Sequence, residues 1–155
     1  MVKKAIILCG GTGSRMFPST LATNKHLMPV YDKPMFFYPL SVLMLSGIKN
    51  FLLIINPGQK KKYVELLNPY ADIGINIEFV EQKKPGGIPE AFILGEKFIG
   101  NDSVALILGD NFFYGSMLTP LIKQSFQTKK GTNIYLYPSK NTSAYGVVEL
   151  NQRGK

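Results

Sequence analysis

Short apolar runs alternate along the chain with longer stretches of helical pattern. Apolar or β-branched runs predict strands at 5–8, 51–55, 75–80, 103–108, 133–137 and 146–150, and helical patterns predict helices at 35–46, 59–67, 90–98 and 117–127. Strands that are apolar nearly throughout and are separated by helices are typical of a parallel sheet covered on both faces. The sequence therefore predicts an α/β fold with a doubly wound, mostly parallel sheet of Rossmann-like type.

Proline and glycine residues mark the ends of several of these elements. Pro34 stands where we expect helix 35–46 to begin, and Gly47 stands where it ends. This helix is apolar nearly all round, so we expect it to be buried on more than one side, against the sheet or a neighbouring subunit. The turn at 56–58 ends the second strand. With no internal repeat, we expect one domain over residues 1–155.

A glycine-rich loop follows the first predicted strand, in the stretch LCGGTGSRMFP. Gly10, Gly11 and Gly13 tolerate positive φ and leave room for backbone N–H groups to approach a phosphate. The pattern matches neither the dinucleotide fingerprint nor the P-loop, so a plain tight turn stays an alternative. Arg15 favours phosphate, because a guanidinium makes bidentate contacts to phosphate oxygens.

Two further polar residues are candidates for the same site. Lys25, in NKHLMPVYDKPM, is a second candidate phosphate ligand, with a solvated lysine as the alternative. Asp110 follows strand 103–108, and ligands of such sheets lie beyond the carboxyl ends of the strands, so we expect it near the glycine loop. Its carboxylate is a candidate Mg²⁺ ligand, and a helix or turn cap is the alternative. His26 is the only histidine, so we interpret it as structural.

Net charge and composition indicate which kinds of partner the protein has. A net charge of +8, from 18 basic and 10 acidic residues, favours anionic partners. The basic residues are spread along the chain without interleaved aromatics, so no nucleic-acid partner is predicted.

Cys9 lies in an apolar run and is interpreted as a core residue rather than a redox or nucleophilic one. No apolar run reaches the length of a signal-peptide core or a membrane span, which predicts a cytoplasmic protein without a membrane partner.

Three stretches carry a resemblance to a known family. LCGGTGSRMFP, NKHLMPVYDKPMFFYPLSVLMLSGIK and LILGDNFFYG closely resemble the sugar-1-phosphate nucleotidylyltransferases, and within them the thymidylyltransferases that use glucose 1-phosphate. The similarity runs from Ala5 to Glu149. It implies that dTTP and glucose 1-phosphate react to give dTDP-glucose and pyrophosphate with Mg²⁺, for deoxysugar and polysaccharide biosynthesis. It also implies a homo-oligomer, which is a tetramer in the family.

The resemblance implies a role for each matching residue. Gly10, Gly11, Thr12 and Gly13 would cradle the nucleotide phosphates, Arg15 and Lys25 would stabilise the transferred phosphoryl group, Gln82 and Gly87 would meet the thymine, Asp110 would bind the metal, and Tyr145 and Gly146 would meet the sugar. The last two also have plain interpretations as a strand-edge aromatic and a turn glycine. A sugar phosphate is largely dianionic near neutral pH, so catalysis would rest on positioning and charge neutralisation rather than on a general base.

The chain departs from the family pattern at several positions. Relatives usually carry alanine at Cys9, aspartate at Gly86, alanine at Pro89 and glutamine at Glu90, and the last three lie beside the expected base pocket. Relatives also continue for nearly as many residues again, with a Glu-Lys-Pro type segment for the sugar phosphate and a second metal-binding aspartate. We therefore expect a nucleotide-binding domain that is incomplete at its carboxyl end. It should bind a nucleoside triphosphate but turn over weakly or not at all by itself.

Two functions of other classes stay open. A non-catalytic nucleotide-binding or regulatory module derived from the family would keep residues 10–15 but lack Mg²⁺-dependent turnover. A nucleic-acid binder, suggested by the net charge of +8, would bind polynucleotide in a strongly salt-dependent way and show no preference for dTTP.

Overall fold

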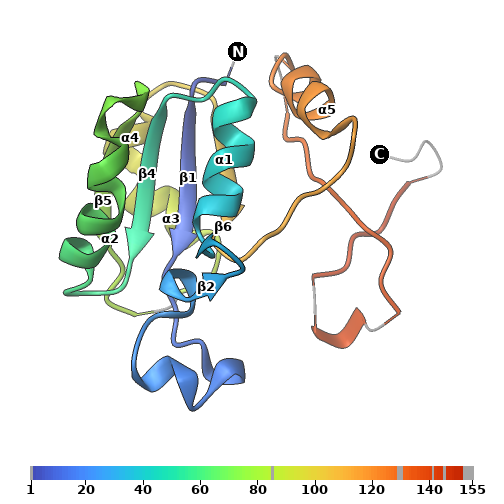
Figure 1. Cartoon of the computed structure of the whole chain (residues 1–155). Helices are drawn as coiled ribbons and strands as arrows, with labels where there is room; N and C mark the ends of the chain where they lie inside the picture. Colours follow the sequence, from blue (N-terminus) through green and yellow to red (C-terminus); the bar gives the residue numbers. More distant parts are fainter. Residues whose placement is uncertain (1, 85, 129–130, 141, 145, 152–155) are drawn as a thin grey trace.

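The centre of the molecule is a four-stranded sheet (Figure 1). The computed structural model describes residues 2–84, 86–128, 131–140, 142–144 and 146–151. The sheet consists of β1 (Lys4–Cys9), β4 (Asn50–Ile55), β5 (Asn76–Glu81) and β6 (Val104–Leu108). Its order is β5-β4-β1-β6, and every neighbouring pair is parallel, with Lys4 opposite both Asn50 and Val104. The predicted parallel sheet is confirmed.

The strand order reverses next to β1. The chain steps outward from β1 to β4 and β5, and then returns to place β6 on the other side of β1. Because parallel connections are right-handed, this reversal puts helices on both faces (Figure 1). They are α1 (Phe37–Leu45) and α2 (Lys60–Leu67) on one face, and α3 (Glu90–Leu94) and α4 (Glu96–Ile99) on the other. The doubly wound fold is confirmed, with its switch point between the carboxyl ends of β1 and β6.

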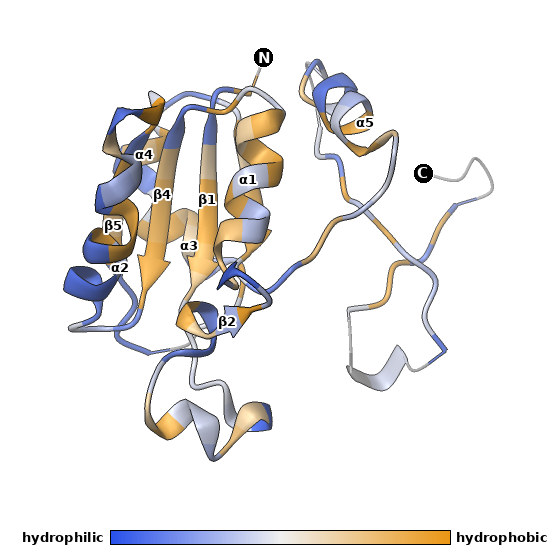
Figure 2. Cartoon of the chain, viewed as in Figure 1, coloured by the Kyte–Doolittle hydropathy of each residue, from blue (hydrophilic) through white to orange (hydrophobic). Residues whose placement is uncertain are grey.

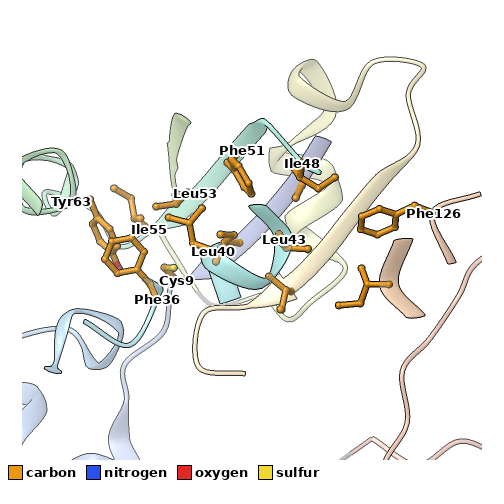
Figure 3. Packing of buried hydrophobic residues seen from close by; sticks show 14 residues of the cluster. Cys9, Phe36, Leu40, Leu43, Ile48, Phe51, Leu53, Ile55, Tyr63 and Phe126 are labelled. Atoms are coloured by element: carbon orange, nitrogen blue, oxygen red, sulfur yellow. The ribbon is translucent and has the colours of Figure 1, made fainter. Parts of the chain in front are cut away.

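Alternate side chains of each strand face opposite sides of the sheet, which divides the core into two layers. In β1, Ala5, Ile7 and Cys9 are buried beneath α1 and α2, whereas Ile6 is buried beneath α3. Each fully buried aliphatic or aromatic side chain stabilises the fold by roughly 1.5–3 kcal/mol. Apolar residues accordingly dominate β1, β4 and α1 (Figure 2). Figure 3 shows the larger layer, with labelled members Cys9, Phe36, Leu40, Leu43, Ile48, Phe51, Leu53, Ile55, Tyr63 and Phe126.

Helix α1 begins later than predicted. Pro34 lies in the short strand β3 (Lys33–Pro34), which pairs with β2 (Pro29–Val30). The N–H groups of Met35 and Phe36 donate to the carbonyls of Met28 and His26, so this stretch is held by the preceding segment before the helix starts. Short 3-10 helices connect the larger elements, at Ser14–Met16, Ser19–Leu21, Lys25–Leu27 and Asn68–Ile73.

The helices lie on the sheet through selected residues. Helix α1 buries Leu40 and Leu43, whereas Leu45 is 66% exposed, so the single chain does not bury this helix on several sides. The predicted helix 90–98 is divided at Gly95, where a Cβ atom would lie 2.9 Å from both Ala91 O and Ile6 Cδ1. Gly95 therefore allows the backbone to lie directly against the sheet. In the described ranges, no helix is long and apolar enough to cross a bilayer.

The chain leaves the sheet after β6. Helix α5 (Leu118–Ser125) contacts the first core layer through Ile122, and Phe126 follows it there. The strands predicted at 133–137 and 146–150 are wrong, because the described residues there form none. A strand needs a neighbouring backbone that exchanges hydrogen bonds with it, and neither run pairs with an edge of the sheet. The element described between these runs is a 3-10 turn at Thr142–Ala144.

Candidate nucleotide-binding site

The glycine loop leaves the carboxyl end of β1 at the switch point. Gly11 and Gly13 have φ values of 106° and 62°, in the left-handed region that favours glycine. The Asn56 side chain clamps the loop with two hydrogen bonds. Its Nδ2 donates to Gly11 O at 2.9 Å, and its Oδ1 accepts from Gly11 N at 2.9 Å. The N–H of Gly11 is therefore occupied by Asn56 in this state of the molecule.

The other glycines of the loop allow close contacts with neighbouring segments. A Cβ on Gly10 would lie 2.4 Å from Gln82 Oε1, and a Cβ on Gly13 would lie 2.7 Å from Thr20 Cγ2. Such distances are far shorter than ordinary van der Waals contact, so these positions accept only glycine without rearrangement. The tight-turn interpretation is therefore confirmed, and phosphate binding by this loop stays a prediction. Thr12 is exposed at the middle of the loop.

Lys25 and Asp110 meet across the switch point. Lys25 Nζ lies 2.5 Å from Asp110 Oδ2, and the two side chains are 25% and 33% exposed. Lys25 belongs to the 3-10 helix that follows the glycine loop, and Asp110 comes directly after β6. Arg15 is exposed in the first 3-10 turn, and the structure gives it no ion pair with a described residue. Lys25 and Asp110 thus meet near the carboxyl ends of β1 and β6, while Arg15 lies on the exposed turn that continues the glycine loop.

Asn24 and His26 hold the segment that carries Lys25. Asn24 Nδ2 donates to Cys9 O at 3.1 Å and to Gln59 Oε1 at 3.0 Å, while Asn24 Oδ1 accepts from His26 N at 2.9 Å. The Nδ1 of His26 lies 2.8 Å from the same Oδ1. Burial, with the nearby charge of Lys25, lowers the pKa of His26 to about 4. The imidazole is therefore neutral at physiological pH, which fits the predicted structural role.

A close approach of two strand ends brings Asp110 to this segment. A Cβ on Gly109 would lie 2.7 Å from both Cys9 Sγ and His26 Cδ2. Only glycine therefore lets the end of β6 lie so near β1 and the Lys25 segment. Burial raises the pKa of the Cys9 thiol to about 12, so this cysteine is not a nucleophile.

The electrostatics of Asp110 suit a cation. Burial raises the pKa of this carboxyl, but the hydrogen bond and charge of Lys25 outweigh burial and hold the pKa below its usual range. The carboxylate is therefore ionised at neutral pH. Among the described residues, no group of three or more histidine, cysteine or acidic side chains could enclose a metal. A single carboxylate fits Mg²⁺, which usually takes one or two carboxylates and completes its octahedron with substrate phosphates and water.

The residues predicted to meet the base lie on the other side of the glycine loop. Gln82 is 5% exposed at the end of β5, and its Nε2 donates to Glu90 Oε2 at 2.5 Å. The backbone N–H of Gly86 donates to the same carboxylate oxygen at 2.7 Å. Gly87 is exposed with a φ of 86°. The contact of Gln82 with Gly10 connects this cluster to the glycine loop.

Of the two predicted sugar-binding residues, the structure describes Gly146 and does not bring it to this site. Tyr145 lies outside the described residues. Gly146 is exposed, and no atom lies within 4 Å of the place where its Cβ would be. Its segment, beyond α5, is far from the ends of β1 and β6 in Figure 1. A sugar-binding role of these two residues stays a prediction.

A cavity of about 490 Å³ lies at the opposite end of the sheet, around Val2 and Asn50. Lys3, Lys49 and Lys123 line it, together with the carboxyl ends of α1 and α5. Cations are favourable beside helix carboxyl ends, where backbone carbonyls carry partial negative charge. Lys123 lies in the last turn of α5 and therefore has this structural explanation.

Sequence reasoning missed two residues that shape the site, Asn24 and Asn56. It named Glu90 only as a departure beside the expected base pocket and did not predict its contact with Gln82. Asn56 was interpreted only as the start of the Asn-Pro-Gly turn, although it also follows directly after β4 at the ligand-binding edge. That position was the available signal. The contacts of Asn24 and Glu90 depend on tertiary neighbours and have no comparable signal in the sequence.

Comparison with known proteins decides the family. The sequence profile described as nucleotidyl transferase matches residues 4–155. The chain belongs to this family. The glucose-1-phosphate thymidylyltransferase of Neisseria meningitidis is 48% identical over 149 residues, which cover 96% of this chain and 52% of that protein. The protein of the same name from Mycobacterium tuberculosis is 46% identical, and the match covers 97% and 52%.

Solved structures agree with this membership of the nucleotidyl transferase family. A crystal structure from Bacillus anthracis, assigned as a glucose-1-phosphate thymidylyltransferase and complexed with sucrose, has a TM-score of 0.74 and 38% identity. The match covers 83% of this chain and 52% of that chain. A UTP-bound UGPase from Acinetobacter baumannii, at 23% identity and a TM-score of 0.67, shares the fold. The chain spans about half the length of the curated relatives it matches.

Proposed function

We propose that this chain is the nucleotide-binding domain of a glucose-1-phosphate thymidylyltransferase. The observation that carries the proposal is the meeting of Lys25 and Asp110 beside the glycine loop, from segments 85 residues apart. Nucleotidyl transfer needs a cation, a carboxylate and an open glycine backbone close together, and a switch point can bring such groups together. Relatives named for that activity match nearly the whole chain, which supports the substrates dTTP and glucose 1-phosphate.

Charge neutralisation is the main task of the cations in the proposed reaction. Lys25 has a long flexible stem, so its ammonium can turn from Asp110 to an oxygen of the α-phosphate when the nucleotide enters. Arg15, on its exposed turn, neutralises charge on the phosphates from the other end of the loop. The sugar phosphate is already largely dianionic near neutral pH, so the residues position it and no general base is required.

Asp110 is the residue proposed to hold Mg²⁺. Movement of the Lys25 ammonium to the phosphates releases Asp110 Oδ2, and the lowered pKa of the carboxyl keeps it charged. Mg²⁺, when bound, supplies charge neutralisation on the phosphates and fixes their orientation. Asp110 would be its protein ligand, and phosphate oxygens and water would supply the other ligands, because the described residues offer no acidic cluster.

A non-catalytic nucleotide-binding module is the second candidate. It is favoured by one observation: the segment after α5, which carries the predicted sugar-binding residues, lies away from the switch point (Figure 1). In that case the glycine loop, Arg15 and Gln82 bind dTTP without turnover. Our expectation for the chain by itself is close to this outcome, namely saturable dTTP binding with weak or absent product formation.

Two measurements on the purified chain test the proposal. Calorimetry with dTTP and Mg²⁺ measures binding, and an enzyme-coupled assay with added glucose 1-phosphate measures pyrophosphate release. Arg15→Ala should weaken dTTP binding at least about tenfold, since a charged hydrogen bond contributes roughly 1.5–3 kcal/mol. Lys61→Ala, at an exposed position of α2, removes the same charge and should leave binding unchanged.

Each outcome of these measurements is decisive. Saturable dTTP binding that Arg15→Ala weakens supports the proposed site. Strong pyrophosphate release, abolished by Arg15→Ala, would mean that this chain holds a complete catalytic site. Absence of dTTP binding would overturn the proposal. The cytoplasmic location, the homo-oligomer and the lack of a nucleic-acid partner stay predictions, and salt-dependent polynucleotide binding without a dTTP preference would contradict the last of them.

A further inference from the structure

The cluster of Gln82, Gly86 and Glu90 contains an unusual arrangement of a buried amide and a carboxylate. Glu90 Oε2 accepts from Gln82 Nε2 at 2.5 Å and from Gly86 N at 2.7 Å. Gln82 is 5% exposed, and Glu90 is half-buried. The carboxylate of this half-buried residue therefore anchors a buried amide.

The carboxylate determines which end of the Gln82 amide faces it. A carboxylate accepts hydrogen bonds and has none to donate, so the NH₂ group must point to Glu90 and the carbonyl oxygen must point away. A Cβ on Gly10 would lie 2.4 Å from Gln82 Oε1, which places this oxygen against the glycine loop. Within the described residues, Oε1 receives no hydrogen bond, and the NH₂ group keeps a second N–H.

We propose that Glu90 is a positioning residue that sets nucleobase selectivity by holding the Gln82 amide in one orientation. The inference rests on the proposed function, in which Gln82 meets the base. The amide held in this way offers an acceptor, Oε1, beside a donor, the second N–H of Nε2. Thymine and uracil carry the complementary pair, a donor at N3 and an acceptor at O4. Cytosine carries the opposite pair, an acceptor at N3 and a donor at N4.

The inference also says what Glu90 does not do. Thymine and uracil share the edge that faces the amide and differ only in the 5-methyl group, so the orientation of Gln82 does not distinguish them. The held amide disfavours cytosine. The N3 acceptor of cytosine would face Oε1 of Gln82, and its N4 donor would face the second N–H of the amide. Buried polar groups would then be left unpaired. The substrate class assigned to the pocket is a keto pyrimidine nucleotide.

Gly86 belongs to the same arrangement. A Cβ at position 86 would lie 2.5 Å from Glu90 Oε2 and 2.8 Å from Glu90 Cδ. The Glu90 side chain can move away from such an atom, but it then loses its hydrogen bonds to Gln82 and to the backbone of residue 86. Gly86→Ala therefore displaces the Glu90 carboxylate while leaving the carboxylate and its charge in the chain.

The test compares dTTP and dCTP binding by the full chain, measured by calorimetry with Mg²⁺ and without sugar phosphate. In Glu90→Gln, the new amide can present either its oxygen or its nitrogen, so Gln82 can adopt both orientations. We expect the ratio of the dCTP and dTTP dissociation constants to fall about tenfold, the effect of unpaired polar groups in a recognition site. Gly86→Ala should lower the ratio in the same direction, while the dTTP to dUTP ratio stays unchanged.

Two controls separate selectivity from folding and from phosphate binding. Glu96→Gln removes an equal charge at an exposed position in the first turn of α4 and should leave the ratio unchanged. Arg15→Ala should weaken dTTP and dCTP together and also leave the ratio unchanged, since the phosphates are common to both. Circular dichroism and thermal unfolding verify that each variant is folded before its ratio is interpreted.

The outcomes distinguish this inference from the proposed function. A lower ratio in Glu90→Gln and Gly86→Ala, with both controls unchanged, supports the inference. A wild-type preference for dTTP that survives in both variants overturns the role of Glu90 and leaves the proposed function intact. Equal wild-type affinity for dTTP and dCTP also overturns the inference while phosphate binding stands. Failure of the wild-type chain to bind either nucleotide overturns the proposed function, and this inference with it.

Discussion

The sheet and the segment after it respond differently to similar sequence patterns. We name the described residues of 2–112 the sandwich, because a sheet lies there between two layers of helices. Within the sandwich, apolar runs became β1, β4, β5 and β6, each paired with a neighbour. In the described residues of 118–151, which we name the carboxyl-terminal segment, the apolar runs at 133–137 and 146–150 remained without a strand. Leu136 and Val147 are 54% and 72% exposed, whereas Leu53 is fully buried. Burial by neighbours, and not apolar character alone, decides what such a run becomes.

The two regions should differ most strongly in the effect of a core truncation. Leu53→Ala, in the middle of β4, removes a fully buried side chain and should lower the free energy of unfolding by about 3–5 kcal/mol. Leu136→Ala makes the same chemical change in the carboxyl-terminal segment and should stay within about 0.5 kcal/mol. Urea unfolding monitored by circular dichroism measures both. Comparable losses would show that the carboxyl-terminal segment is packed as tightly as the sandwich.

Acidification should act on the sandwich through His26. Folded His26 has a pKa of about 4, while an unfolded imidazole titrates near 6.5, so protons bind preferentially to the unfolded chain between these values. The contribution of His26 to the free energy of unfolding is therefore fully present above pH 6.5 and is lost as the pH drops towards 4. We expect a loss of about 2–3 kcal/mol between pH 7.5 and 4.5.

Urea unfolding at several pH values, with His26→Asn as the comparison, tests this assignment. The variant should show a flatter profile between pH 6.5 and 4, whatever its stability at neutral pH. The carboxyls of Asp102 and Asp110, whose pKa values are lowered, contribute stability that is lost only at lower pH. An unchanged slope in His26→Asn would assign the acid response to other groups.

A matched pair of asparagines sharpens the comparison at smaller scale. Asn56 clamps Gly11 in the sandwich with two hydrogen bonds, and Asn56→Ala should lower the free energy of unfolding by about 1–2 kcal/mol. Asn133 Nδ2 donates to Ser125 O and Thr128 Oγ1 on the exposed carboxyl-terminal segment, where Asn133→Ala should have an effect below about 0.5 kcal/mol.

The same pair also separates stability from binding. Asn56→Ala frees the glycine loop and should weaken dTTP binding several-fold, because the loop loses its fixed shape. Asn133→Ala should leave dTTP affinity unchanged. Equal effects of the two substitutions on affinity would show that the clamp on Gly11 does not shape the nucleotide site.

Parts of the candidate site could be predicted from local sequence. The glycines at 10, 11 and 13 follow a strand, and Asp110 follows another, so topology alone predicted that they would be near one another. The ion pair of Lys25 with Asp110 was not predicted, because its two members are 85 residues apart. The clamp of Asn56 was also missed, since the Asn-Pro-Gly pattern is explained by a turn. Tertiary neighbours, which a single sequence does not reveal, decide such contacts.

The sequence by itself determined the parallel sheet, the succession of its strands and main helices along the chain up to β6, and the edge of the sheet at which we propose that the nucleotide binds. These features depend on local periodicity, on turn residues and on the handedness of parallel connections, all of which act over short stretches. Only the tertiary structure decided that Glu90 orients Gln82, that Asn24 and His26 hold Lys25, and that the apolar runs at 133–137 and 146–150 form no strand. The reason is that hydrogen-bond partners and strand edges come from distant parts of the chain, and their positions are known only once the chain has folded.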